Sequence, residues 1–373
     1  MPRTILSLPK KQAPILRLNS ICPYYTMFPL NYPFKVLSGA KRSHVLLDPF
    51  CGRGTSLYAA RLKGMRAYGI DSNPVAAAVA TSKLLLVSSK SIYDLCKTIL
   101  QNCQIPENIP TGLFWEICYH QDTLIELCKL RNYLLTNCTT DEEKMLRAII
   151  LGILHGPKAR VNSTYLSNQM PRTYATKPDP AIKYWLNRDM QPDKFSVLQL
   201  VKKRAEFTLS ELPAITGGNV LCADSRGETV YNALPPVDWV ITSPPYFGMR
   251  TYVPDQWLRN WFMGGPAYVE YAHKDQLSHH KAEFLRDLSI VWSNCASACA
   301  PGAKMRIRFG SLPSEMNDAR QVLIDSVTKA DCGWSISAIR NAGLASNGHR
   351  QADHFNSKTG EAAAEIDLYA SLL

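Results

Sequence analysis

Two hydrophobic patterns divide the chain. One consists of short, nearly continuous apolar runs, which are typical of buried strands in a parallel sheet, at residues 44–48, 66–71, 219–224 and 237–241. The other lies between the second and third runs, where leucines recur at helical spacing over residues 124–135. The patterns therefore predict an α/β sheet that is interrupted by a long, largely helical insertion.

The segments between the strands predict how the sheet is connected. A helix is expected at residues 56–63, and another begins at Asn73-Pro74, with Asn73 as its N-cap. Such a strand–turn–helix–strand unit implies parallel strands joined by right-handed crossovers. A fifth strand is expected at 303–309, and a closing antiparallel pair at 334–340 and 365–373. The predicted fold is a Rossmann-like, mostly parallel sheet with helices on both faces.

The insertion separates two halves of one sheet domain. Residues 1–86 are expected to form an N-terminal arm and the first half, and residues 216–373 the second half. Between them, residues 87–215 are too long for an ordinary connection, so we expect a functional module. Residues 151–210 contain ten Lys and Arg against four Asp and Glu, a net charge of +6. This charge suits a module that recognises a nucleic-acid target.

Charge and cysteine usage narrow the class of protein. Lys and Arg number 42 against 31 Asp and Glu, which favours nucleic acid as a partner, although a basic surface can also serve solubility alone. None of the eleven cysteines forms Cys-x-x-Cys, so we expect reduced thiols and no metal site. Residues 1–11 lack the apolar segment of a signal peptide, and no apolar run is long enough to cross a bilayer. We therefore expect a cytoplasmic protein without a membrane partner.

Three predicted strands end in acids: Asp48, Asp71 and Asp224. The carboxyl ends of strands are where open α/β sheets bind cofactors, and Gly52 and Gly54 form a turn that a ligand can approach closely. The turn matches neither Gly-x-Gly-x-x-Gly nor a P-loop, which favours a nucleoside ligand without phosphates. Asp71 is placed to accept hydrogen bonds from ribose hydroxyls, and Asp224 from an adenine amino group. Each acid alone is better explained as a turn or helix-cap residue; the combination of the three acids with the glycine turn predicts a cofactor site.

The fourth predicted strand runs into Ser243-Pro244-Pro245-Tyr246. Two consecutive prolines fix φ and remove two backbone donors. Such a loop can offer acceptors to an amino group while the aromatic ring stacks on the attached base. The tetrapeptide is also an ordinary turn, so its interpretation depends on the cofactor site upstream.

The residues Asp48-Pro49-Phe50-Cys51-Gly52-Arg53-Gly54-Thr55, followed by Thr242-Ser243-Pro244-Pro245-Tyr246, resemble the S-adenosylmethionine-dependent amino methyltransferases of DNA. The resemblance covers residues 20–86 and 216–373. It implies that Phe50, Gly52 and Gly54 line the methionine part of the cofactor, that Asp48 faces its ammonium, and that Asp71 and Asp224 hold the ribose and adenine. The segment around Tyr25 and Thr26 resembles the N-terminal cofactor motif of the family.

Arg53 departs from the small residue that the family often has between these glycines, and it is expected to face solvent or a nucleic-acid phosphate.

In this family a Ser before Pro-Pro usually accompanies methylation of cytosine N4, and Asp or Asn accompanies adenine N6. The resemblance therefore implies site-specific methylation of cytosine N4 on a base flipped out of duplex DNA, as in restriction–modification systems, where a companion endonuclease is possible. Three alternatives stay open: adenine N6, an RNA base on the same fold, and a non-catalytic nucleic-acid-binding module.

Two further groups of residues are candidates for contact with nucleic acid. Arg160, Arg172 and Lys177 lie in a polar segment that has the composition of a DNA-contacting loop, or of an ordinary solvated one. Lys304, Arg306 and Arg308 alternate along a predicted strand and so share one face, which either borders a groove or is partly solvated. Trp257 and Trp261 are four residues apart and are expected to pack rather than to touch bases.

Overall fold

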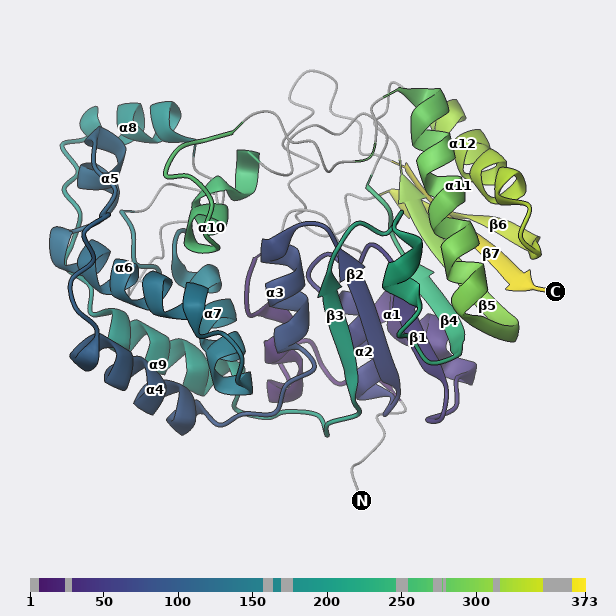
Figure 1. Cartoon of the computed structure of the whole chain (residues 1–373), viewed down its shortest axis with the longest axis horizontal. Helices are drawn as coiled ribbons and strands as arrows, with labels where there is room; N and C mark the ends of the chain where they lie inside the picture. Colours follow the sequence, from purple (N-terminus) through teal and green to yellow (C-terminus); the bar gives the residue numbers. More distant parts are fainter. Residues whose placement is uncertain are drawn as a thin grey trace.

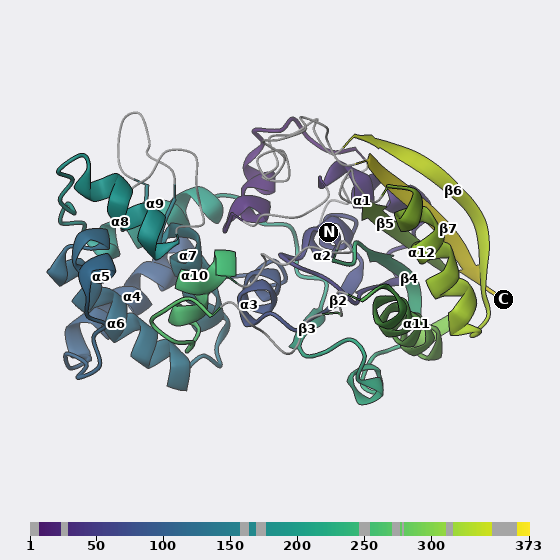
Figure 2. The same cartoon turned by 90° about the horizontal axis from the view of Figure 1, so that it is seen from above.

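The computed structural model describes residues 7–23, 29–156, 164–168, 177–245, 254–270, 277, 280–310, 316–344 and 364–373. A seven-stranded sheet with its own helices lies beside a separate group of helices in both views (Figures 1 and 2).

The sheet is parallel apart from one strand. Strand β7 lies between β5 and β6 and runs antiparallel to both, whereas the other neighbours are parallel. The strand order across the sheet is β3 (Gly218–Cys222), β2 (Arg66–Asp71), β1 (Val45–Asp48), β4 (Val237–Thr242), β5 (Cys299–Gly310), β7 (Ala364–Leu372) and β6 (Trp334–Leu344). The predicted fold class, with its closing antiparallel pair, is confirmed.

Successive residues of the central strands bury their side chains on opposite faces, as the pleat requires. Leu46 of β1 belongs to one apolar cluster together with α2 (Thr55–Leu62) and α3 (Pro74–Ser82). Val45 and Leu47 belong to a second cluster, with α11 (Lys281–Ala298) and α12 (Met316–Ala330). Both faces of β1 are therefore covered, which explains its continuous apolar run.

The predicted helical insertion is present in the described part of the chain. Its helices are α4 (Ser89–Asn102), α5 (Leu113–Cys118), α6 (Gln121–Thr136), α7 (Asp141–Ile153), α8 (Pro178–Leu186) and α9 (Val197–Thr208). Side-chain oxygens of Ser88, Thr140 and Ser196 accept hydrogen bonds at the starts of α4, α7 and α9, so local sequence sets these boundaries. We call these helices, together with α10, the helical group.

Helix α10 (Trp257–Phe262) belongs to this group although the sequence division placed it with the second half of the sheet. The rings of Trp257 and Trp261 lie 5.8 and 4.6 Å from that of Trp115 on α5. Arg131 Nε on α6 donates to the Trp261 carbonyl at 2.7 Å. The two tryptophans are only 3% exposed, so the prediction that they pack is confirmed. Helix α10, which follows the Ser-Pro-Pro loop in the sequence, therefore packs in the helical group and not on the sheet.

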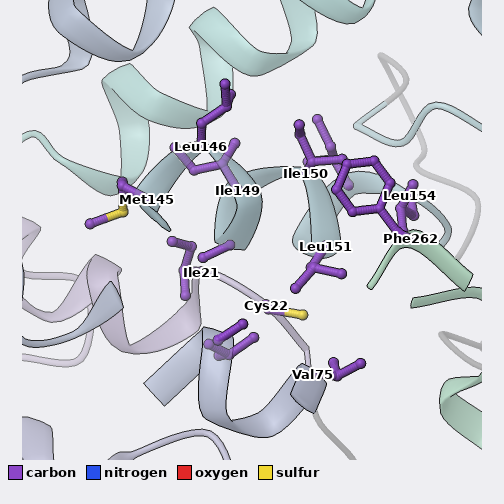
Figure 3. Close-up of a cluster of buried hydrophobic side chains, with 14 of the residues drawn as sticks. Ile21, Cys22, Val75, Met145, Leu146, Ile149, Ile150, Leu151, Leu154 and Phe262 are labelled. Atoms are coloured by element: carbon purple, nitrogen blue, oxygen red, sulfur yellow. The ribbon is translucent and has the colours of Figure 1, made fainter. Parts of the chain in front are cut away.

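The N-terminal segment packs between the sheet domain and the helical group. Ile21 and Cys22 lie between α7 and α3, as Figure 3 shows, and are fully buried. A Cβ on Gly152 of α7 would stand 2.1 Å from the Ile21 carbonyl oxygen, so only glycine permits this approach. The apolar cores of the two regions are consequently continuous.

Candidate active site

The topology brings the two sequence motifs to one edge of the sheet. Strands β1 and β4 are parallel neighbours, with Leu47 paired to Val240. Thr242, the last residue of β4, donates from Oγ1 to Asp48 Oδ1 at 2.6 Å, and Asp48 is the last residue of β1. The glycine turn and Ser243-Pro244-Pro245 therefore leave adjacent strands at the same end.

The glycine turn is hydrogen-bonded to β2 and is open at Gly52. Cys51 N donates to the Ile70 carbonyl at 3.0 Å, which ties the turn to β2. Gly52 and Gly54 have φ of +50° and +76°, and a Cβ on Gly54 would stand 2.9 Å from Ala80 of α3. A Cβ on Gly52 would meet nothing within 4 Å. This open side is where a ligand can approach the backbone.

Asp48 is 1% exposed and connects the two loops. Its carboxylate accepts hydrogen bonds from the hydroxyls of Ser56 and Thr242 and from Phe50 N. Burial raises the pKa of Asp48 to about 7, although these donors lower it. The carboxyl thereby positions the glycine turn against β4; its contact with the cofactor ammonium stays a prediction.

Asp71 is held beside the glycine turn. Its Oδ2 accepts from Gly52 N at 2.8 Å, and its Oδ1 accepts from Asn73 N at 2.9 Å. Burial raises the pKa of Asp71 to about 6, against the effect of these backbone donors. Each carboxylate oxygen can accept a second hydrogen bond, so Asp71 can still bind hydroxyl groups. Asn73 caps α3 as predicted, accepting from Val75 N at 2.9 Å.

Asp224 follows β3 at the same edge and has a partner that the sequence reasoning missed. Arg226 donates to both oxygens of Asp224, with the shortest distance 2.6 Å, and also to Asp287 on α11 at 3.1 Å. Burial opposes ionisation, but the hydrogen bonds from Arg226 lower the pKa of Asp224. Any adenine bound here would share Asp224 with this arginine. The signal in the sequence was an arginine two residues after the acid.

The described residues of the predicted catalytic motif directly follow Thr242, which is hydrogen-bonded to Asp48. Ser243 and Pro245 are partly exposed and Pro244 is buried. Phe50 packs edge-on against Trp292 of α11, with ring centroids 6.2 Å apart. Five predicted site residues, Tyr25, Thr26, Arg160, Arg172 and Tyr246, lie outside the described residues.

The remaining basic candidates have partners within the protein. Lys177 Nζ lies 3.8 Å from Asp255 Oδ1. Arg308 forms a two-bond pair with Asp367, at 2.7 and 2.8 Å, and lies 3.7 Å above the ring of Tyr32. Lys304 and Arg306 lie over the ring of Trp239. The alternating cations of β5 therefore brace the sheet, which disfavours the expectation that they border a nucleic-acid groove.

Arg53 differs most from its expected position. It is 7% exposed, so the expectation that it faces solvent is wrong. Nothing in the local sequence signals this burial, because the residues around Arg53 come from other parts of the chain.

All eleven cysteines are free thiols, and the described residues contain no cluster of three or more potential metal ligands. No helix in the described ranges is long and apolar enough to cross a membrane.

Comparisons with known proteins give a remote structural likeness. No family model matches the chain, and no curated sequence is significantly similar to it. Among solved structures, the rRNA methyltransferase aviRa from Streptomyces viridochromogenes is 10% identical, with 94% of this chain and 87% of that chain covered and a TM-score of 0.33. TrmN from Thermus thermophilus is 9% identical, with 96% of this chain and 53% of that chain covered and a TM-score of 0.38. An S-adenosylmethionine-dependent methyltransferase from Methanosarcina mazei is 10% identical, with 93% of this chain and 98% of that chain covered and a TM-score of 0.32.

Proposed function

We propose that this chain is an S-adenosylmethionine-dependent methyltransferase that modifies the exocyclic N4 amine of cytosine in DNA. The proposal rests on the position of two loops. The glycine turn and the Ser-Pro-Pro loop follow neighbouring parallel strands, and the Thr242–Asp48 hydrogen bond joins the ends of these strands. A donor at the first loop and an acceptor at the second can therefore share one pocket.

The residues at this edge suit the cofactor. The open side of Gly52 admits a ligand, Asp71 retains acceptor capacity for ribose hydroxyls, and Asp224 lies one strand further out for adenine. When bound, S-adenosylmethionine supplies an electrophilic methyl group on a sulfonium. The role of this chain is to hold an amine in line with that methyl.

The Ser-Pro-Pro loop suits the amine. The target base leaves the duplex stack, at a cost of a few kcal/mol that pocket contacts offset. Ser243 Oγ and the Pro244 carbonyl accept the two amine hydrogens, and Tyr246 stacks on the ring. With these contacts Ser243 and Pro244 would hold the amine nitrogen against the methyl group that the bound cofactor would supply, and the methylated nitrogen would lose one proton. Alignment of the nitrogen, the methyl carbon and the sulfur provides much of the rate.

Incubation with labelled cofactor and duplex DNA, followed by nucleoside mass spectrometry, tests the proposal. N4-methylcytosine is the expected product. N6-methyladenine, or transfer only to structured RNA, would overturn the substrate assignment, and absence of any transfer would favour a non-catalytic binding module.

Ser243→Ala tests the role of the loop. We expect methyl transfer to fall by at least about tenfold because one acceptor of the amine is lost, while cofactor affinity stays unchanged. Ser297→Ala removes an exposed hydroxyl on α11 and serves as the matched control. Transfer at the parental rate by Ser243→Ala would contradict the assigned role.

A further inference from the structure

Arg53 is a buried cation without a counter-charge in its described surroundings. Its side chain is more than nine-tenths buried, and its Nε has no hydrogen-bond partner among the residues that the structure describes. Buried charges in proteins are ordinarily paired and hydrogen-bonded, because an unpaired one is costly. A guanidinium left in this condition indicates that an anion belongs beside it.

A second buried cation lies near Arg53. Lys83 follows α3 and is fully buried, and its Nζ donates to Asn19 Oδ1 at 2.7 Å and to the Asn19 carbonyl at 3.2 Å. Burial lowers the pKa of Lys83, and the nearby charge of Arg53 lowers it further. Two basic groups thus share one buried region, the partner atoms of Lys83 among the described residues are neutral, and an anion bound there would favour the charged form of both groups. This arrangement raises the local demand for negative charge.

The position of Arg53 restricts the size of the anion. It stands between Gly52 and Gly54, on the turn whose Gly52 side is open, and Thr55 Oγ1 in the same turn is also buried with no partner within the described part of the chain. A phosphate on a DNA or RNA backbone belongs to a bulky polymer and requires an accessible guanidinium. A small carboxylate at the end of a ligand that enters over Gly52 fits a side chain this deeply buried.

We propose that Arg53, supported by the charge of Lys83, binds the α-carboxylate of the methionine part of S-adenosylmethionine. This inference rests on the proposed function, since it assigns a residue to the end of the same cofactor. A planar guanidinium pairs with a carboxylate through parallel N–H···O bonds. Arg53 is then a specificity-determining residue that selects the intact amino-acid cofactor.

Decarboxylated S-adenosylmethionine isolates the effect, because it differs from the cofactor only in that group. Calorimetry on the wild type should show that S-adenosylmethionine binds about 10- to 100-fold more tightly than the decarboxylated compound. Arg53→Ser restores the small residue typical of the family and should bind both ligands alike, at the weaker level. Arg66→Ser removes an exposed arginine from the same sheet and should behave as the wild type.

A thermal measurement separates binding from a structural role. Arg53→Ser should raise the melting temperature of the free protein, because a buried unpaired charge is removed, and should reduce the increase that S-adenosylmethionine produces. Equal loss of affinity for both ligands, or equal affinities in the wild type, would overturn the assignment. The wild-type comparison needs no variant, so it decides the matter even if Arg53→Ser fails to fold.

The outcomes also distinguish this inference from the proposed function. A wild type that binds neither ligand would overturn both. A wild type that discriminates between the ligands but methylates no nucleic acid would overturn the proposed function and leave the carboxylate subsite standing.

Discussion

The pKa values of buried acids shift in opposite directions at the carboxyl edge of the sheet and in the helical group. At the edge, Asp48 and Asp71 are held by loop backbone and hydroxyl donors, and burial raises the pKa of both. In the helical group, Glu143 accepts from Thr139 N and Thr140 N, each at 2.9 Å, and closes the capping box that starts α7. Burial raises the pKa of Glu143, but these bonds and those from side chains bring it below its usual value.

The difference separates residues that stabilise from residues that position. The helical group gains stability from its acid and from an aromatic core that includes Trp115, Trp185 and Trp257. The sheet edge instead keeps acids and a cation at a cost to stability, which is expected where a ligand binds.

The largest expected effect tests the core of the helical group. Trp115→Ala should lower the free energy of unfolding by about 3–5 kcal/mol, because it empties the contact between α5 and α10. Urea denaturation measures this, with Leu113→Ala on the same helix as the control, since Leu113 is exposed. A loss below about 1 kcal/mol would contradict the stabilising role given to this core.

The pH dependence of stability should have opposite signs in the two regions. The pKa of Asp48 rises from 3.8 to about 7 on folding, so the folded state binds more protons across that window, and stability falls as pH rises through it. The total is on the order of 4 kcal/mol, and Asp48→Asn should flatten this part of the profile.

Glu143→Gln provides the opposite case. Folding lowers the pKa of Glu143 from its usual value of 4.5. Glu143 therefore adds to the free energy of unfolding at pH values above 4.5, and this contribution is lost as pH falls through the pKa of the folded state. The variant should therefore be destabilised at neutral pH and approach the wild type in acid. Denaturation curves from pH 3 to 8 would contradict the comparison if both variants changed the profile in the same direction.

A smaller effect separates the cost of backbone strain from the cost of close packing at two glycines of the sheet domain. Gly54 and Gly302 both have φ of +76°, but a Cβ would approach Ala80 only at Gly54, and at Gly302 it would meet nothing within 4 Å. Gly302→Ala should cost about 1 kcal/mol, and Gly54→Ala about 2–3 kcal/mol, with weaker cofactor binding as well. If thermal unfolding showed the same loss of stability for both variants, the glycine turn would have to move away from α3 to accommodate the added Cβ.

The sequence predicted most of the sheet because its signals are local. The apolar run before Asp48, the glycines after it and the Asn73-Pro74 start of α3 each depend on neighbouring residues, and the structure has all three. The same holds for the helical insertion, whose caps are read from adjacent residues. The membership of α10 was missed because its partners, such as Trp115 and Arg131, are more than one hundred residues away.

The residue types alone account for the kinds of groups at the ligand edge: two glycines that can adopt positive φ, acids at strand ends and a proline-stiffened loop. Which of these groups meet depends on the folded structure. It paired Asp48 with Thr242 across 194 positions of sequence, brought Asp287 of α11 to the arginine that binds Asp224, and enclosed Arg53 near Lys83. The physical reason is that backbone preference acts between neighbours, whereas burial and charge pairing depend on every segment that packs against a site.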